Sequence, residues 1–221
     1  MKLNASTVRN LFFILSLLFT AFSSFAQNDT KVRELLDKSS EAFMQAGGIE
    51  ADFTLNIKDA SSTSQAFDGH ILLKSSKFFI ETPEYAIFFD GKTQWVYNKA
   101  FDEVNISEPD EKEVQTLNPA SIYTMYKKGC NYKYLGEKTD IKMRKVQEIE
   151  LITTNKKEDI NKIIVQLDKT DLMPLMFHIH FNNGMENQVY INQYKTQQVV
   201  SDAVFSFDKT KHPQVEIIDL R

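Results

Sequence analysis

The beginning of the chain changes from a helical hydrophobic pattern to an alternating one. Residues 29–46 place apolar side chains on one helical face and charged side chains on the other, and Gly47 and Gly48 follow them. From Ile49 to Lys58, apolar and polar residues alternate with a period of two. The pattern therefore predicts an amphipathic helix that rests on an apolar surface, followed by a half-buried strand.

Short strand patterns occupy most of the remaining chain. The first series of predicted strands after Lys58 comprises residues 67–73, 78–81, 85–89, 93–98 and 103–107. A second series runs from Tyr132 onward and includes residues 146–153, 162–168, 173–182, 188–194 and 204–207. Asp90-Gly91 and Asn182-Asn183-Gly184 are hairpin turn signals within these series. Strands this short, arriving in sequence order, predict an antiparallel meander of about eleven strands.

Residues 107–128 interrupt the strand pattern. They contain two prolines, and Asn118-Pro119 is suited to cap and begin a short helix whose apolar side includes Ile122 and Met125. A long twisted sheet tends to curl or close. We therefore expect a mainly β fold with covering helices, of the α+β class. Its expected form is a half-open antiparallel β-barrel with a helical lid over a hydrophobic cavity.

The first 26 residues have the three parts of a secretory signal peptide. Basic Lys2 and Arg9 precede an apolar run over 11–22, and Ser24-Phe25-Ala26 follows with small residues at both recognition positions. A membrane-spanning helix needs about 20 apolar residues, more than this run supplies. No cysteine follows the cleavage region to receive a lipid anchor. We expect residues 1–26 to be cleaved and residues 27–221 to form one exported, soluble domain.

Charge and cysteine content narrow the possible partners and chemistry. Removal of residues 1–26 takes away two basic residues and leaves 24 basic against 30 acidic side chains, a net charge of −6. This acidic balance argues against nucleic acid as a partner. Cys130 is the only cysteine, so no intramolecular disulfide can form. We expect Cys130 to be a small core residue, and a nucleophile or an intermolecular bridge are the alternatives.

The sequence lacks the familiar catalytic and cofactor motifs. It has no Gly-rich phosphate loop, GxSxG, HExxH or CxxC pattern. We therefore expect a protein that is not an enzyme, with no catalytic residues, cofactor or metal. His178 and His180 lie on the same side of one predicted strand and could chelate a metal, but no third ligand is obvious. An enzyme that acts on a lipid or polysaccharide through this strand is an alternative.

Aromatic residues are abundant, with 17 Phe, 8 Tyr and 1 Trp. A filled core accounts for most of them, but residues 78–80, 86–89 and 95–97 are apolar on both faces of successive strands. A surface sheet needs only one apolar face. We expect one face to pack under the helices and the other to line a cavity for a lipid. The predicted lining residues are Phe43, Ile122 and Met125 from the helices, and Phe53, Leu55, Leu73, Phe78, Phe88, Trp95 and Tyr97 from the sheet.

Several of these segments together resemble the outer-membrane lipoprotein carrier family, LolA. The resemblance rests on residues 69–74, Lys77-Phe78, Glu81-Thr82-Pro83 and residues 89–98, which include the string DGKTQWVY. It implies a half-open barrel, lidded by helices, whose cavity takes the acyl chains of a lipoprotein. The resemblance further implies a monomer that receives its cargo from an inner-membrane transporter and crosses the periplasm to an outer-membrane acceptor. A periplasmic binding protein for another lipid or hydrophobic ligand is the alternative.

One position departs from the family pattern. Family members often carry an Arg-Pro pair after the second strand, and the arginine holds the lid helices shut; this chain has Lys74-Ser75-Ser76 there. A lysine lacks the planar fork with which an arginine binds several carbonyl groups. Lys74 is therefore the candidate replacement for this arginine, and the sequence does not decide whether it holds the lid helices.

Overall fold

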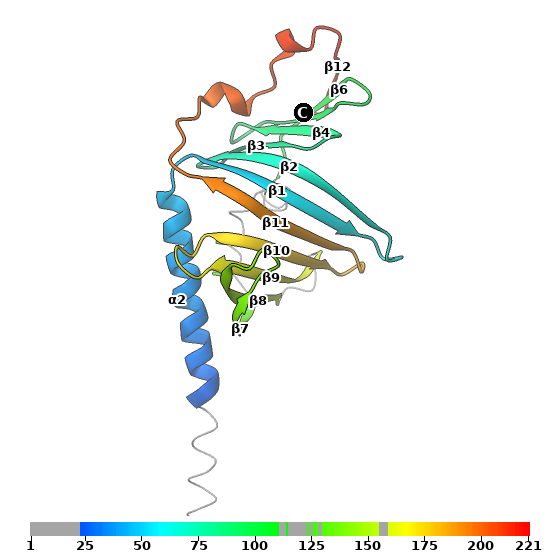
Figure 1. Ribbon diagram of the computed structural model, residues 1–221. Coiled ribbons are helices and arrows are strands. Elements are labelled where there is room, and N and C mark those ends of the chain that lie inside the picture. Colours follow the sequence, from blue (N-terminus) through cyan, green and yellow to red (C-terminus); the bar gives the residue numbers. More distant parts are fainter. Residues whose placement is uncertain (1–22, 111–113, 115–122, 124–125, 128–129, 155–158) are drawn as a thin grey trace, which may run out of the picture.

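The structure is a computed structural model that describes residues 23–110, 114, 123, 126–127, 130–154 and 159–221. These residues form one long helix, α2 (Ser23–Gln45), and a single sheet of twelve strands (Figure 1). Helix α2 confirms the predicted amphipathic helix and ends just before Gly47, whose φ of +68° suits a glycine at a helix end. Within the described part of the chain, no helix combines the length and apolar character needed to span a membrane.

The strands form two meanders and a final short strand. The first meander comprises β1 (Ile49–Lys58), β2 (Ser64–Lys74), β3 (Lys77–Glu81), β4 (Tyr85–Phe89), β5 (Gln94–Asn98) and β6 (Glu103–Ser107). The second comprises β7 (Cys130–Thr139), β8 (Lys145–Thr153), β9 (Ile160–Asp168), β10 (Pro174–Phe181) and β11 (Glu186–Lys195), and β12 (Glu216–Asp219) ends the sheet. The strand predicted at 204–207 is wrong, because Asp202–Phe205 instead forms a short 3-10 helix, η2. A second 3-10 turn, η3, follows at Lys209–Lys211.

The two meanders join side by side in one open sheet. The strand order is β12-β6-β5-β4-β3-β2-β1-β11-β10-β9-β8-β7, and β1 pairs with β11 where the meanders meet. Every pair is antiparallel except β12 with β6, so the sheet is mixed. Figure 1 shows it strongly twisted and bent. The sheet is not closed into a barrel, because closure requires the two edge strands to pair, whereas β12 and β7 lie at opposite ends of the order. The half-open form and the helical lid stay predictions.

One face of the sheet is apolar across most of its width. Residues that pair in register share a face, so each row crosses several strands. One such row consists of Phe89, Phe78, Leu73 and Ile49. A second row consists of Leu55, Val189, Phe177, Val165 and Ile149. We call this side the inner face, because helix α2 packs on it.

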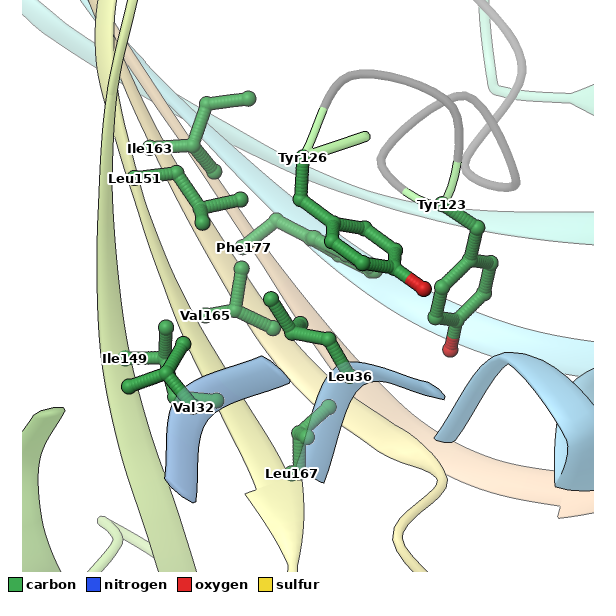
Figure 2. Close-up of a cluster of buried hydrophobic side chains, with 10 residues drawn as sticks. All are labelled: Val32, Leu36, Tyr123, Tyr126, Ile149, Leu151, Ile163, Val165, Leu167 and Phe177. Carbon is green, nitrogen blue, oxygen red and sulfur yellow. The ribbon is translucent and has the colours of Figure 1, made fainter. Parts of the chain in front are cut away.

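Helix α2 buries its apolar side in two groups of side chains. Val32 and Leu36 are fully buried and enter the helix cluster, which Figure 2 shows. This cluster consists of Val32, Leu36, Tyr123, Tyr126, Ile149, Leu151, Ile163, Val165, Leu167 and Phe177. The central cluster lies mainly over β1–β4 and extends to β11; it consists of Ala46, Ile49, Ala51, Phe53, Ile71, Leu73, Phe78, Phe89, Met173 and Ile191. Phe43 packs against both, so the end of α2 connects the two parts of the core.

Gly69 leaves space for an aromatic ring in the central cluster. It pairs with Phe53 across β1 and β2, and a β-carbon built at position 69 would lie 2.3 Å from the ring tip of Phe53. A glycine within a strand often marks a close approach of this kind. The Phe53 ring therefore lies over the backbone of Gly69 and fills the space that a side chain would take.

Replacing Gly69 by alanine should destabilise the protein by about 1–3 kcal/mol, because the buried Phe53 ring has little room to move away. In a Phe53→Leu background, the same substitution should cost much less, since the shorter side chain does not reach the new methyl group. Chemical denaturation of the four proteins measures this coupling. Equal losses of unfolding free energy in both backgrounds would contradict the steric explanation.

Candidate functional site

Helix α2 is held on the inner face by hydrogen bonds as well as by packing. Ser39 Oγ donates to the carbonyl oxygen of Leu172 at 2.7 Å and lies 2.8 Å from the Tyr123 hydroxyl. Because the serine has only one hydroxyl hydrogen, Tyr123 must be the donor in the second bond. The Tyr126 hydroxyl donates to Asp37 Oδ1 at 2.5 Å. These bonds attach α2 to neighbouring segments across the apolar core.

Burial changes the acidity of the two tyrosines. It raises the pKa of Tyr123 to about 12, and it also raises the pKa of Tyr126, with a further contribution from the Asp37 carboxylate. Both phenols therefore remain neutral hydrogen-bonding groups throughout the physiological pH range. The contact between α2 and these tyrosines does not depend on pH near neutrality.

The apolar inner face extends beyond its fully buried clusters. Leu55, Ile80, Ile87 and Val189 pack against the central cluster but are only half-buried. Ile80 pairs with Ile87, and Leu55 pairs with Val189, so these residues lie on either side of β2 on the same face. We call these four residues the apolar rim. Its side chains are less deeply buried than those of the central cluster on which they pack.

Five of the predicted lining residues lie together on the inner face. Phe53, Leu73 and Phe78 belong to the central cluster, and their side chains are buried. Phe43 and Leu55 pack against that cluster. Ile122 and Met125 lie outside the described residues. The structure thus groups half of the predicted residues, and their role in lipid binding stays a prediction.

The other three predicted residues lie on the opposite, outward face. Phe88 pairs with Trp95, and Tyr97 is two residues further along β5, whereas the neighbouring Phe89 points to the inner face and joins the central cluster. Successive residues of a strand point to opposite sides of the sheet. Phe88, Trp95 and Tyr97 therefore do not share a surface with Phe53, Leu73 and Phe78.

The chain after β11 covers this outward apolar patch. The ring of Phe207 lies 5.8 Å from Phe88 and 5.5 Å from Tyr97, and His212 lies 4.6 Å from Tyr97, between ring centroids. Phe205 in η2 is completely buried. We call residues 196–215 the C-terminal cover. The prediction that these strands are apolar on both faces is confirmed. Their outward face, however, packs against the C-terminal cover.

Two lysines attach the C-terminal cover to the sheet. Lys74 Nζ donates to the Val200 carbonyl at 2.9 Å and to Asp202 Oδ1 at 2.7 Å, and Lys77 Nζ donates to Asp202 Oδ2 at 2.7 Å. The hydrogen bond from Lys74, followed by that from Lys77, lowers the pKa of Asp202 to about 2. In the described part of the chain, Lys74 therefore binds the C-terminal cover and makes no hydrogen bond to α2.

The outward face of the other strands carries several paired polar side chains. His70 Nδ1 lies 2.8 Å from Asp52 Oδ1, and Glu148 accepts hydrogen bonds from Lys138 and Gln166. His178 and His180 also lie on this face, away from the apolar rim, because Phe177, which precedes them, belongs to the helix cluster and Ile179, which lies between them, packs against it. These polar groups thus lie on the side of the sheet opposite to the helix cluster.

Cys130 lies at the start of β7 and is half-buried with a free thiol. Burial raises the pKa of this thiol above its usual value. A raised pKa disfavours the thiolate that a cysteine nucleophile requires. The environment of Cys130 therefore suits a packed residue better than a reactive one.

Comparison with known proteins identifies the family. Residues 22–185 match the family model described as "Outer membrane lipoprotein carrier protein LolA". A curated relative, an uncharacterized protein MJ0687 of Methanocaldococcus jannaschii, is 30% identical over 166 residues. The match covers 72% of this chain but 46% of that protein, so the chain spans about half the length of its relative. The family model covers α2 and the strands β1, β3 and β4, which carry Leu55, Ile80 and Ile87 of the apolar rim, and it ends just before β11, which carries Val189.

Solved structures share the fold at low sequence identity. An uncharacterized conserved protein from Thermus thermophilus has a TM-score of 0.57 at 11% identity, and the match covers 86% of this chain and 99% of that one. MucB has a TM-score of 0.50 at 12% identity, and the match covers 81% of this chain and 63% of that one. At these identities, the likeness concerns the fold alone.

Loss of the Asp202 contacts should free the C-terminal cover. In Lys74→Ala and Asp202→Asn, we expect protease cleavage within residues 196–215 to be roughly threefold or more faster at neutral pH, because local opening becomes easier. Lys92→Ala is the matched control, since Lys92 pairs with Glu108 at an exposed position away from the cover. Equal cleavage of all four proteins, wild type included, would show that the two lysines do not retain the cover.

The same contact predicts a pH dependence. Since the pKa of Asp202 is lowered from 3.8 to about 2, its ion pairs stabilise the fold fully above pH 3.8 and are lost as the pH falls through about 2. The unfolding free energy of wild type should therefore fall in this window by more than that of Asp202→Asn. Acid titration followed by circular dichroism measures the difference, and identical curves would contradict it.

Proposed function

The chain belongs to the outer membrane lipoprotein carrier protein LolA family, and from this membership we propose that it binds the acyl chains of lipoproteins on its inner face and carries them across the periplasm. The observation that carries the proposal is the apolar rim. Leu55, Ile80, Ile87 and Val189 continue the core of the sheet into half-buried positions. Partly exposed apolar surface next to a core is what an acyl chain would cover.

The free energy of burying an acyl chain sets what a carrier must provide. Burying one methylene group stabilises by about 0.8 kcal/mol, so a long acyl chain represents on the order of 10 kcal/mol. A carrier must recover most of this free energy in order to hold its cargo in water. It must also release the cargo, so its apolar surface has to be covered again when the chain leaves.

Helix α2 is the proposed movable cover of the inner face. Phe43 packs against both core clusters and lies 5.4 Å from the Tyr123 ring. A displacement of this end of α2 would open the central cluster toward the rim and enlarge the surface for an acyl chain. In this proposal the expected half-open barrel corresponds to the bent sheet with α2 as its lid.

Carrier function requires binding and release, and no bond in the cargo needs to be made or broken. We therefore propose that the protein is not an enzyme. The expected signal at residues 1–26 would deliver it to the periplasm. Its proposed partners are a lipoprotein-releasing transporter of the inner membrane and, where one exists, an acceptor of the outer membrane.

Ile87→Gln should weaken the uptake of a fluorescent fatty acid or a triacylated lipopeptide by about tenfold, because it places an amide where an acyl chain would lie. Ile164→Gln is the matched control, since Ile164 is also half-buried but lies on the outward face of β9, between the inward-facing Ile163 and Val165. Fluorescence titration measures both variants. If Ile87→Gln and wild type bound the ligand with equal affinity, the inner face would not be the binding surface.

A second candidate is a binding protein for another lipid or hydrophobic molecule. All four residues of the apolar rim are aliphatic, so their chemistry admits different acyl-bearing ligands. Mass spectrometry of the ligand that copurifies with the protein from its native host distinguishes the two candidates. We expect lipoproteins or lipopeptides, and a free lipid as the dominant species would favour the second candidate.

A further inference from the structure

Three potential metal ligands meet on the polar outward face, away from the apolar rim. His178 and His180 alternate along β10 and therefore point to the same side. Glu186 on β11 is the register partner of His180. The hairpin turn between the two strands, with Gly184 at a φ of +85°, brings Glu186 beside the histidines. No third ligand was obvious in the sequence, because the register that places Glu186 opposite His180 is seen only in the folded hairpin.

The distances between these groups are those of a compact ligand set. His178 Nε2 lies 2.9 Å from Glu186 Oε2, and His180 Nδ1 lies 4.0 Å from the same oxygen. The two imidazole rings lie 4.0 Å apart between centroids. One ligand atom from each residue can be chosen so that all three lie within 4.8 Å of one another. A single ion with bonds of about 2 Å can bridge atoms at such separations after small side-chain rotations.

We propose that His178, His180 and Glu186 bind one divalent transition-metal ion of the zinc class. Two imidazole nitrogens with one carboxylate oxygen form a ligand set that Zn²⁺ accepts, and the set leaves at least one coordination position open to solvent. Oxygen-preferring ions such as Mg²⁺ are disfavoured, because two of the three ligands are nitrogen.

The surroundings of the three residues support this assignment. Lys58 Nζ lies 3.5 Å from Glu186 Oε1, which orients the carboxylate and leaves Oε2 directed at the histidines. Such outer contacts typically orient a metal-binding carboxylate. The Nε2 atom of His180 is buried and has no hydrogen-bond partner. An imidazole with an unused ring nitrogen retains the capacity to coordinate an ion.

The nearby charges limit the expected affinity. Lys58 contacts Glu186, and Lys162, the register partner of His180 on β9, lies 3.4 Å from Glu150. Two ammonium groups and two carboxylates therefore surround the histidines, and the local charge nearly cancels. We expect micromolar rather than nanomolar affinity for Zn²⁺, consistent with a reversible surface site.

Isothermal titration calorimetry with ZnCl₂ on the chain without a histidine tag tests the proposal. We expect one Zn²⁺ per chain, with affinity reduced about tenfold or more in His180→Asn and in Glu186→Gln. Co²⁺ provides a second readout, since its visible absorption should show bound nitrogen and oxygen ligands in wild type and not in the variants. Circular dichroism without metal checks that each variant is folded, and Glu186→Gln keeps the shape of the native side chain.

His70→Gln is the matched control. His70 lies on the same polar face beside Asp52, but it has no second histidine next to it. We expect its Zn²⁺ affinity to equal that of wild type. Absence of Zn²⁺ binding to wild type, unchanged binding in both His180→Asn and Glu186→Gln, or an equal loss in His70→Gln would overturn the assignment. None of these outcomes affects acyl-chain binding on the inner face, which the Ile87 variant tests separately.

Discussion

Apolar side chains on both faces of β2–β5 require two separate covers, and the rest of the structure depends on this requirement. Neighbouring residues of a strand, such as Phe88 and Phe89, cannot enter the same core, because they point to opposite sides of the sheet. The end of α2 packs on the inner face through Ala42 and Phe43, and the C-terminal cover packs on the outward face. Two contacts from Lys74 and one from Lys77 hold the second cover in place. Without both covers, one large apolar surface would face water.

The two covers differ in a way that bears on function. The C-terminal cover is attached by ion pairs and by backbone hydrogen bonds from Gln197 to Ala46 and from Gln198 to Gly48. Helix α2 buries its apolar side on a face that continues into the half-buried rim. A lipid competing for the inner face therefore meets partly exposed apolar groups, whereas on the outward face it would have to displace aromatic packing. This difference favours the inner face as the side for cargo.

The open sheet also keeps polar chemistry apart from the apolar side. The outward face over β9–β11 carries His178, His180 and Glu186, while the alternate residues of β10 enter the core. A charged or metal-bound group can therefore act on this face without disturbing the packing of α2. The same alternation that separates the two covers thus produces two chemically independent surfaces on one sheet.

The sequence by itself determined the family and most of the local elements, although the strand predicted at 204–207 is a 3-10 helix and β12 was not predicted. The switch from helical to alternating periodicity at Gly47-Gly48, the order of the short strands and the string DGKTQWVY all follow from neighbouring residues. Only the tertiary structure decided that β1 pairs with β11, that β12 and β7 remain apart, and that Phe207 rather than a cavity lies on Phe88 and Tyr97. It likewise brought Glu186 to the histidines and Asp202 to Lys74. Local periodicity reports which side chains are apolar, but contacts between distant segments depend on register and chain direction, which no local pattern contains.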